Sequence, residues 1–385
     1  MRIAMFTETF LPSTDGIVTR LCATLKHLEE EGHEVLLFAP SGAPEKYASA
    51  TIVGIPAMPF ILYPEKRFSL PLPRIGRHLR KFQPDLIHSV NPAFLGIGGI
   101  YYAWRYHLPL IASYHTNVPA YARHYKLNFL EPALWWYFRT LHNRANLNLA
   151  TSRATMNELD KQGFRNLGLW ERGVDVEVFQ KASRSEEMRS RLAPGAGVGD
   201  PVLLYVGRLA SEKNIERIRP CLDAIPNLHL AIVGDGPYRP DLERIFAGTT
   251  ANFTGYMHGT ELATAYASAD AFLFPSTTET LGLVLFEAMA TGLPVLAADS
   301  PPTREVLEEG KAGFIFDSSS TESMIQLVKD MIHDEARREV VRNRGLEIAR
   351  TLDWRGPSEQ LLRHYESVCK AHGILSQPVS SSSRP

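Results

Sequence analysis

Cysteine is scarce in this sequence. Its 385 residues include three cysteines, Cys22, Cys221 and Cys369, which lie far apart and form no CxxC motif or Cys/His cluster. Structural zinc sites and disulfide-stapled folds need closely spaced or paired cysteines. The sequence therefore predicts a protein of a reducing compartment without a metal site.

Long apolar runs and a strong excess of one charge are also missing. No stretch of about 18 apolar residues occurs, so we expect no membrane-spanning segment. Residues 1–7 have the pattern of a strand and not of a signal peptide. The formal net charge is -1, whereas nucleic-acid binders usually carry a clear basic excess. We expect a cytoplasmic protein with no nucleic-acid partner.

The first half of the chain alternates short apolar runs with helical patterns. This alternation is typical of a parallel sheet covered by helices on both faces. The expected buried strands are Arg2–Phe6, Glu34–Phe38, Asp85–Ser89, Leu108–Tyr114 and Asn146–Ala150. The expected helices are Gly16–Glu31, Leu95–Tyr106 and Pro132–Arg144.

The same alternation begins again in the second half. The expected strands are Pro201–Val206, Leu228–Val233, Ala271–Phe274 and Pro294–Ala297, and the helices lie near Ile215–Ala224, Gly259–Ala267 and Leu283–Thr291. The fold class is thus α/β, with two Rossmann-like domains whose parallel sheets face each other across a cleft. Ligands of such sheets bind beyond the carboxyl ends of the strands.

Composition also predicts the domain boundaries. Residues 1–180 form the N-terminal domain, the polar stretch 181–200 is the linker, and residues 201–355 form the C-terminal domain. An amphipathic helix within 356–372 is expected to pack back on the N-terminal domain. The Ser/Pro-rich tail 373–385 is expected to be disordered.

Three residues in the first half are candidate ligand contacts. Asp15 and Gly16 lie where the first strand gives way to a helix, and a glycine there lets backbone N–H groups approach a diphosphate. A plain helix cap formed by Asp15 or Thr14 is the simpler alternative. His115 follows a strand and could hydrogen-bond substrate hydroxyls, although a lone histidine is more often structural.

Candidate phosphate contacts follow two strands of the second half. Arg208 and Lys213 come just after the strand that ends at Val206 and could neutralise a leaving phosphate. The alternative is a solvated turn in which Glu212 pairs with Lys213. Gly234 begins a glycine turn after the next strand.

The most specific motif is ETLGLVLFE, which runs from Glu279 to Glu287. Gly282, followed by Leu283 and Val284, lets the backbone approach phosphate at a helix start. Glu279 would accept hydrogen bonds from sugar hydroxyls, and Glu287 would accept them from a ribose diol.

Taken together, these residues resemble the retaining GT-B glycosyltransferases of family 4. The resemblance covers residues 1–372 and adds Arg172, in the motif RGVD that ends at Asp175. It implies a nucleotide-diphosphate sugar as donor, bound mainly by the C-terminal domain, and an acceptor bound mainly by the N-terminal domain. It also implies that no cofactor or metal ion is essential, and the sequence offers no DxD metal signature.

Longer stretches are similar to the sulfoquinovosyltransferases of cyanobacteria and plastids. That resemblance implies transfer of sulfoquinovose from UDP-sulfoquinovose to diacylglycerol, by front-face attack in which the leaving phosphate takes the acceptor proton. Pro301 and Pro302 depart from the glycine pair that is frequent in the family. The similar stretches are FTETFLPSTDGIVTRL, FQPDLIHSVNPAFLGIGGIYYA, IASYHTNVPAYARHY, LWERGVDVEVFQ and FPSTTETLGLVLFEAMATG.

A lipid acceptor requires access to a bilayer, and two segments are candidates for that contact. Residues 64–81 and 121–144 combine basic residues with apolar and aromatic ones, which suits an anionic membrane surface. We expect a peripheral protein on the inner or thylakoid membrane. The alternative is that Trp135 and Trp136 belong to the core and the basic stretch is a solvated loop.

Three other functions fit parts of the pattern. A lipid mannosyl- or glucosyltransferase using GDP-mannose or UDP-glucose would need nearly the same residues, since Glu279, Glu287 and Arg208 do not contact the sixth carbon of the sugar. A nucleotide-sugar 2-epimerase would share the two domains and need no lipid. A nucleotide-sugar-binding scaffold would not need both glutamates and both cations.

Overall fold

The computed structural model describes residues 1–60, 63–120, 128–280 and 282–374. The chain forms two compact units. Unit 1 consists of residues 1–116, 132–171 and 355–385, and unit 2 consists of residues 117–131 and 172–354. The predicted disordered tail 373–385 lies outside the described residues from position 375 onward.

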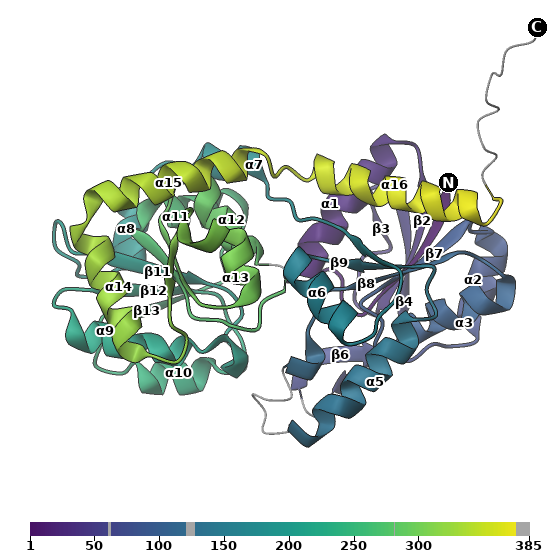
Figure 1. The fold of residues 1–385 in the computed structure, drawn as a ribbon, viewed down its shortest axis with the longest axis horizontal. Helices are drawn as coiled ribbons and strands as arrows, with labels where there is room; N and C mark the ends of the chain where they lie inside the picture. The colour runs from purple at the N-terminus through teal and green to yellow at the C-terminus, as the bar shows by residue number, and fades with distance from the viewer. Residues whose placement is uncertain (61–62, 121–127, 281, 375–385) are drawn as a thin grey trace, which may run out of the picture. The chain divides into compact units, whose positions relative to one another are not determined.

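Unit 1 is built on a sheet with the strand order β10-β9-β8-β7-β1-β2-β4-β3, in which β3 pairs antiparallel and the other pairs are parallel (Figure 1). A hairpin of β5 and β6 accompanies it. The strands are β1 Arg2–Thr7, β2 Glu34–Pro40, β3 Lys46–Tyr47, β4 Ala50–Ile55, β5 Ala57–Phe60, β6 Tyr63–Ser69, β7 Leu86–Val90, β8 Leu110–Tyr114, β9 Leu147–Ala150 and β10 Leu167–Leu169.

Helices cover both faces of this sheet, and its central strands are therefore buried on both sides. Helices α1 and α16 pack on one face through residues such as Leu25 and Leu361, and α2 and α3 pack on the other through Leu79 and Ile100 (Figure 1). The helices are α1 Gly16–Glu30, α2 Arg74–Phe82, α3 Gly96–Tyr106, α5 Glu131–His142, α6 Arg153–Lys161 and α16 Arg355–Ala371.

Unit 2 repeats this plan with an all-parallel sheet in the order β13-β12-β11-β14-β15-β16. Its strands are β11 Val202–Val206, β12 His229–Val233, β13 Ala251–Gly255, β14 Ala271–Phe274, β15 Val295–Ala298 and β16 Phe314–Phe316. Its α-helices are α7 Val176–Gln180, α8 Glu186–Leu192, α9 Arg219–Ala224, α10 Arg239–Ile245, α11 Gly259–Ser268, α12 Leu283–Ala290, α13 Pro301–Val306, α14 Thr321–His333 and α15 Glu335–Arg350. The 3-10 helices of the chain are η1 Asn128–Leu130, η2 Ser211–Lys213, η3 Ile215–Ile218 and η4 Glu308–Gly310.

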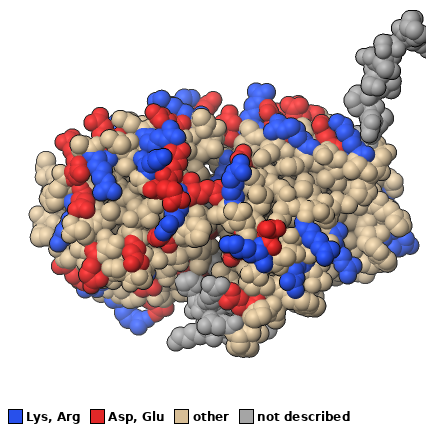
Figure 2. Space-filling model, viewed as in Figure 1, with Lys and Arg blue, Asp and Glu red and all other residues tan. Residues whose placement is uncertain are grey.

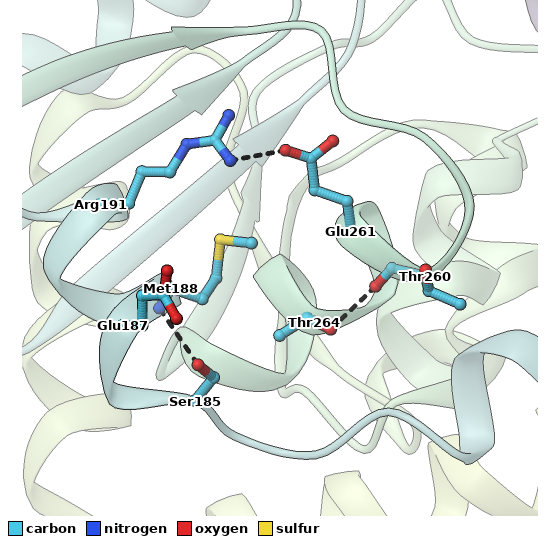
Figure 3. A pocket seen from close by; sticks show the side chains of 7 residues that line it. All are labelled: Ser185, Glu187, Met188, Arg191, Thr260, Glu261 and Thr264. Atoms are coloured by element: carbon cyan, nitrogen blue, oxygen red, sulfur yellow. Dashed lines mark hydrogen bonds and ion pairs between the residues drawn. The ribbon is translucent and has the colours of Figure 1, made fainter.

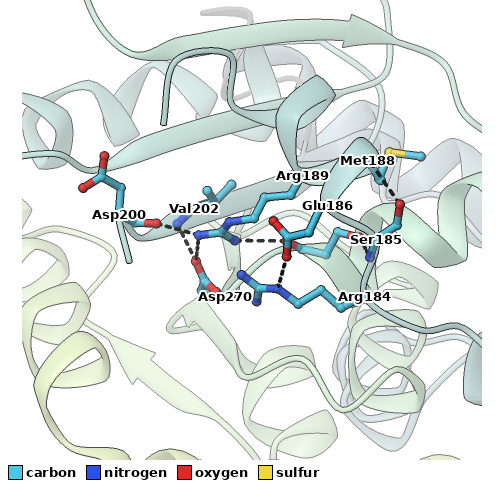
Figure 4. A network of polar contacts seen from close by, with 9 residues as sticks. Arg184, Ser185, Glu186, Met188, Arg189, Asp200, Val202 and Asp270 are labelled. Carbon is cyan, nitrogen blue, oxygen red and sulfur yellow. Dashed lines mark hydrogen bonds and ion pairs between the residues drawn. The ribbon is translucent and has the colours of Figure 1, made fainter. Parts of the chain in front are cut away.

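The predicted linker 181–200 is wrong, because much of it is a folded part of unit 2. Helix α8 lies in this stretch, and its Leu192 is fully buried in the core of the unit. Arg189 is buried as well and donates to Asp270 Oδ2 at 2.9 Å and to the Asp200 carbonyl oxygen at 2.6 Å (Figure 4). The chain therefore passes from unit 1 to unit 2 near residue 172.

The proline pair that departs from the family pattern has a local explanation. Pro301 and Pro302 open α13, and the side chain of Ser300 caps that helix by accepting from the Thr303 N–H at 3.3 Å. Proline is well suited to the first turn of a helix, since its missing N–H has no intrahelical acceptor there.

Candidate active site

The candidate residues of unit 2 gather where three neighbouring parallel strands end. Arg208 and Lys213 follow β11, Gly234 follows β12, and Glu279 and Gly282 follow β14. Since β12, β11 and β14 are adjacent and parallel, their carboxyl ends lie at one edge of the sheet. This is the edge at which open α/β sheets bind ligands.

Two ion pairs join the charged residues at this edge. Lys213 Nζ donates to Glu279 Oε2 at 2.7 Å, and Arg208 contacts the carboxylate of Glu212. The Glu212 side chain has no solvent exposure, whereas the side chains of Lys213 and Glu279 are 11% and 24% exposed. Each cation is thus held by a carboxylate that fixes its position, which is the preorganised arrangement that favours binding of a developing phosphate charge.

The sequence interpretation of Glu212 as part of a solvated turn is wrong. Glu212 is buried and pairs with Arg208, four positions before it, while Lys213 pairs with Glu279. The turn of η2 separates the two neighbouring side chains in this way. The burial of Glu212 was missed, although its spacing from Arg208 is that of a helical ion pair.

Glycine is required where the loops after β11 and β12 meet. A Cβ atom on Gly234 would lie 2.0 Å from the Gly207 carbonyl oxygen, and one on Gly236 would lie 2.3 Å from the Leu209 carbonyl oxygen. Both values are far below van der Waals contact. The two loops therefore approach backbone to backbone, which brings the Arg208 loop beside the Gly234 turn.

Helix α12 begins directly behind Glu279. Gly282 caps it in the left-handed conformation, with φ at 62°, which suits glycine. A Cβ on Gly282 would lie 3.7 Å from Glu279 Cγ, so the first turn with Leu283 and Val284 starts next to that carboxylate. The first N–H groups of a helix have no intrahelical acceptor, and such groups bind anions.

Glu287 lies further along α12 and is held by a second helix. Tyr266, on α11, donates its hydroxyl proton to Glu287 Oε2 at 2.9 Å. Burial raises the pKa of Glu287 to about 7, and the hydrogen bond from Tyr266 lowers it in part. The carboxyl group is therefore close to its midpoint of titration near neutral pH. Sequence inspection missed Tyr266, because it comes from a different helix.

Arg172 stabilises the same helix from the start of the segment that enters unit 2. It is 6% exposed, and its guanidinium lies over the Phe286 ring, 5.5 Å from the ring centroid. A cation over an aromatic face is attracted by the ring quadrupole. The motif that contains Arg172 is thus placed against α12, next to Glu287.

His115 belongs to unit 1 and lies in a buried polar network. Its Nε2 is 2.9 Å from Ser113 Oγ, and its ring contacts Trp170 edge to face at a centroid distance of 5.4 Å. Burial lowers the pKa of His115 well below its usual value, and the charge of Arg20 lowers it further. The imidazole is therefore neutral at physiological pH.

Asp15 and Gly16 also belong to unit 1, where the structure gives Asp15 a capping role. Its Oδ1 accepts from the Val18 N–H at 3.1 Å at the start of α1, and its Oδ2 accepts from Thr9 Oγ1 at 3.1 Å. This is the simpler of the two roles suggested by the sequence. A diphosphate contact at Gly16 stays a prediction.

The same loop contains a carboxylate that the sequence did not reveal as important. Glu8 accepts hydrogen bonds from four successive backbone N–H groups at the start of α3, those of Ala93, Phe94, Leu95 and Gly96, at 2.8 to 3.2 Å. The loop after β1 is thus fixed to α3, which positions the cap of α1.

The two segments expected to contact a membrane are described in part. The side chains of residues 59–67 and 121–128 lie outside the described residues. Of the two tryptophans in the second segment, Trp135 is buried in unit 1, as the alternative interpretation expects, whereas Trp136 is 59% exposed. In the first segment, α2 buries Ile75 and Leu79 and has no acidic residue.

An aromatic surface that sequence inspection missed lies beside α2. Trp104 of α3 is 68% exposed and neighbours the exposed Tyr101, at a centroid distance of 6.1 Å. Helix α3 is joined to α2 by the hydrogen bond from Arg80 to the Tyr106 hydroxyl at 3.3 Å. Figure 2 shows lysine and arginine side chains scattered over the visible face of unit 1, with uncharged surface between them.

A surface pocket of about 310 Å³ in unit 2 is separate from these residues. It lies between α8 and α11, and an ion pair between Arg191 and Glu261 crosses one side of it (Figure 3). Its lining contains none of the candidate site residues; it consists of Ser185, Glu187, Met188, Arg191, Thr260, Glu261 and Thr264.

Among the described residues, no group of three or more His, Cys, Asp or Glu side chains is placed to hold a metal ion. Within the same part of the chain, no helix has the length and apolar character needed to cross a bilayer.

The chain matches two sequence families over most of its length. Residues 14–178 match Glycosyltransferase Family 4, and residues 188–347 match Glycosyl transferases group 1. Each match lies largely within one of the two Rossmann-like units.

Curated relatives and solved structures extend these matches. The sulfoquinovosyl transferase of Arabidopsis thaliana is 37% identical over 94% of this chain and 72% of its own length. A GDP-mannose-dependent alpha-mannosyltransferase of Mycobacterium tuberculosis is 37% identical over 96% and 97%, and an alpha-monoglucosyldiacylglycerol synthase of Streptococcus pneumoniae is 28% identical over 82% and 75%. The Anabaena protein HepE, solved with UDP and glucose, shares the fold with a TM-score of 0.77 and 19% identity over 95% of this chain and 99% of its own. The chain therefore belongs to the family 4 glycosyltransferases and has their GT-B fold.

Proposed function

We propose that this glycosyltransferase transfers sulfoquinovose from UDP-sulfoquinovose to diacylglycerol, with retention of the anomeric configuration and without an essential metal ion. The observation that carries the proposal is the Lys213–Glu279 pair beside the start of α12. It combines a cation for a leaving phosphate, an acceptor for sugar hydroxyls and a helix N-terminus for the diphosphate. The sulfoquinovosyl transferase relative, with 37% identity, supports the choice of sugar.

The donor would bind at the edge formed by β12, β11 and β14. The ionised Glu287 would accept hydrogen bonds from the two ribose hydroxyls. Tyr266 would continue to donate its own hydrogen bond to the same carboxylate. The diphosphate would bind the backbone N–H groups of Leu283 and Val284 and the cations of Arg208 and Lys213.

The transfer itself would need no enzymic nucleophile. The bond between the anomeric carbon and the leaving diphosphate oxygen breaks, and its electron pair passes to the diphosphate. The acceptor hydroxyl oxygen bonds to the anomeric carbon on the same face, and its proton passes to the leaving phosphate. Lys213 and Arg208 would stabilise the growing negative charge, and Glu279 would orient the sugar. His115, which is neutral, would contact the sugar or the acceptor hydroxyl.

An enzyme with a lipid acceptor needs a surface that contacts the membrane. We propose that α2 and α3 of unit 1 form this surface. The exposed side of α2 is basic, and the neighbouring α3 exposes Tyr101 and Trp104. Basic side chains beside exposed aromatics suit the headgroup region of an anionic leaflet. This surface overlaps the predicted segment 64–81. Its exposed tryptophan is Trp104, whereas Trp135 of the predicted segment 121–144 is buried.

A second candidate is a mannosyl- or glucosyltransferase that acts on a lipid. It is favoured by the mannosyltransferase relative, which has the same 37% identity and matches over nearly its whole length, and by the glucosyldiacylglycerol synthase relative. The residues that would hold ribose and diphosphate do not contact the sixth carbon of the sugar, so they fit either donor.

The test is a comparison of UDP-sulfoquinovose, UDP-glucose and GDP-mannose as donors to diacylglycerol in vesicles with excess EDTA. The proposal predicts glycolipid from UDP-sulfoquinovose in preference to the other two. Product from another donor alone would replace sulfoquinovose by that sugar. Product that appears only when a divalent cation is restored would contradict metal independence. Conversion of the donor to an epimer without a lipid product would favour the epimerase.

A further inference from the structure

A chain of buried hydrogen bonds runs from the last helix of unit 1 to His115. Tyr365, on α16, places its hydroxyl 2.7 Å from His88 Nδ1, and His88 Nε2 is 2.9 Å from Ser113 Oγ. Ser113 Oγ is in turn 2.9 Å from His115 Nε2. All four residues are buried, and they come from α16, β7, β8 and the residue just after β8.

The two histidines of this chain are neutral, so each ring has one N–H donor and one acceptor nitrogen. Burial lowers the pKa of His88 to about 3, and it lowers that of His115 well below its usual value. A neutral ring between two hydroxyl groups must donate to one of them and accept from the other. The hydrogen bonds through His88 can therefore run in one of two directions, from Tyr365 to Ser113 or the reverse.

The phenol of Tyr365 decides between these directions. Among the described residues, His88 is the hydrogen-bond partner that the structure gives to this hydroxyl, which is fully buried. If Tyr365 only accepted, its own O–H would be left buried without an acceptor, at a substantial cost in free energy. Tyr365 therefore donates to His88 Nδ1, and His88 Nε2–H donates to Ser113. The Ser113 hydroxyl is buried as well, and the side-chain partners that the structure gives it among the described residues are the two histidines, so its own proton goes to His115 Nε2.

From this order we infer that Tyr365, His88 and Ser113 are positioning residues that hold His115 in the tautomer protonated at Nδ1. The inference deepens the proposed function and rests on it for the role of His115. Because Nε2 is used to accept from Ser113, the proton of the neutral ring lies on Nδ1, and under the proposed function this N–H would donate to a sugar or acceptor oxygen. His115 then stabilises an oxygen atom and does not take the acceptor proton, in agreement with proton transfer to the leaving phosphate.

The packing around the chain keeps the two rings in place. Trp170 contacts both imidazoles, at centroid distances of 5.6 Å to His88 and 5.4 Å to His115. Arg20 lies over the Trp170 ring at 4.4 Å and donates to the backbone carbonyl oxygens of Trp170 and Glu171. Its positive charge disfavours a second proton on either histidine, which maintains the neutral forms on which the order depends.

The experiment is nitrogen NMR of the full chain with labelled histidine, in which protonated and unprotonated ring nitrogens have distinct chemical shifts. The His115 signals are assigned by their loss in His115→Gln. In the unaltered protein we expect Nδ1 of His115 to be protonated and Nε2 to be unprotonated. Protonation at Nε2 would overturn the inference. Because no substrate is present, this result does not depend on whether the proposed function is correct.

Two variants test whether the order originates at Tyr365. Tyr365→Phe keeps the ring in the core and removes the first donor, and Ser113→Ala removes the last. Each should give a mixture of both His115 tautomers and lower kcat/KM by about 10-fold, the scale of one neutral hydrogen bond. The double variant should lose no more than either single one, since both act through the same tautomer.

Tyr47→Phe is the matched control. Tyr47 packs against the same core cluster, and its hydroxyl interacts with Cys22 instead of the histidines. It should leave the His115 signals and the activity unchanged. A Tyr365→Phe protein that is folded, as judged by its thermal midpoint, and keeps His115 wholly protonated at Nδ1 would overturn the role of Tyr365. Loss of activity with an unchanged tautomer would do the same.

Discussion

Lys213 Nζ and Glu279 Oε2 lie 2.7 Å apart, at the ends of two adjacent strands of unit 2. The pair is partly exposed, so a ligand can reach both groups, and each group limits the movement of the other. Arg208 is held in the same way by the buried Glu212. If the donor binds here as proposed, the charges are in place beforehand, which would lower the reorganisation needed in the transition state.

Removal of either partner of this pair should reduce turnover. We expect Glu279→Ala and Lys213→Ala to lower kcat by at least about 100-fold, the scale of a lost preorganised electrostatic contact. Glu308→Ala is the control, because it removes an ion pair of similar length, 2.6 Å to Arg344, elsewhere in unit 2. Steady-state kinetics of the three variants checks this. Full activity in Glu279→Ala or Lys213→Ala would remove that residue from its assigned role.

Nucleotide affinity should depend on the ionisation of Glu287. With a pKa of about 7, the carboxyl becomes protonated below neutral pH and can then no longer accept from both ribose hydroxyls. We expect the Kd of UDP to increase as the pH falls below 7, by at most about tenfold per unit. Calorimetric titration should show this, and Glu287→Gln corrects for the titration of the phosphate itself.

The hydrogen bond from Tyr266 provides an independent test of the same group. It favours the ionised carboxylate, so Tyr266→Phe should move the midpoint of the Kd profile to higher pH. A profile with the same midpoint in both proteins would show that Glu287 does not set the affinity.

Crowding at Gly234 should make this position intolerant of any side chain. Gly234→Ala would force a Cβ to 2.0 Å from the Gly207 carbonyl oxygen, and we expect a loss of about 3 kcal/mol or more in the unfolding free energy of unit 2. Gly248→Ala is the control, since Gly248 also has positive φ, at 76°, but has no atom within 4 Å of the added Cβ. It should lose only about 1 kcal/mol. Equal losses in urea denaturation would refute the steric explanation.

Buried neutral histidines should make unit 1 sensitive to acid. The pKa values of His88 and His142 are lowered to about 3 and about 4, whereas the unfolded chain binds these protons near pH 6.5. Between these values the unfolded state binds more protons. The unfolding free energy should therefore fall with the pH below about 6.5, by up to about 1.4 kcal/mol per unit for each histidine, and should be independent of them above it.

His142→Phe isolates one of these contributions. It removes one titrating group, along with the contact to Asn148 Oδ1 at 2.9 Å. The slope of the unfolding free energy against pH should therefore decrease by the contribution of one proton. Glu287 contributes with the opposite sign between about pH 4.5 and 7, because its pKa is raised. The comparison with the unaltered protein cancels that contribution. If His142→Phe and the unaltered protein showed the same pH dependence of the unfolding free energy in urea denaturation, the assignment to His142 would be contradicted.

Vesicle binding tests the surface formed by α2 and α3. Arg77→Glu with Lys81→Glu should weaken binding to anionic vesicles by at least about 2 kcal/mol, since each cation near such a surface is worth about 1 kcal/mol. Trp104→Ala should weaken it through lost apolar contact. Lys26→Glu is the control, because Lys26 is exposed on α1, on the other face of the sheet. Weak binding that does not respond to salt would count against the surface.

The parts of the fold that could be predicted from sequence are those buried on both sides. Strand β11 is a wholly apolar run, and β1 is apolar from Ile3 to Phe6, because helices cover both faces of a parallel sheet. Short edge strands gave no such signal. Strand β13, from Ala251 to Gly255, is only partly buried and mixes polar with apolar residues.

Features that depend on distant partners could not be predicted. The sequence of helix α8 is polar, which is typical of a linker. Its Arg189 is buried by a hydrogen bond to Asp270, and this partner lies 81 positions away in the sequence. The same reason applies to Tyr266 beside Glu287 and to Tyr365 beside His88. In contrast, Glu279, Gly282 and Glu287 could be identified, since the chemistry of a helix start is local in the sequence.

The most direct test of the account is the anomeric configuration of the lipid product formed from UDP-sulfoquinovose and diacylglycerol. Front-face transfer at the site of Lys213 and Glu279 predicts a glycolipid with the same anomeric configuration as the donor, read from the coupling of the anomeric proton in both compounds. A product of the opposite configuration would require inversion and would contradict the proposed mechanism, and transfer from UDP-glucose or GDP-mannose but not from UDP-sulfoquinovose would contradict the proposed donor.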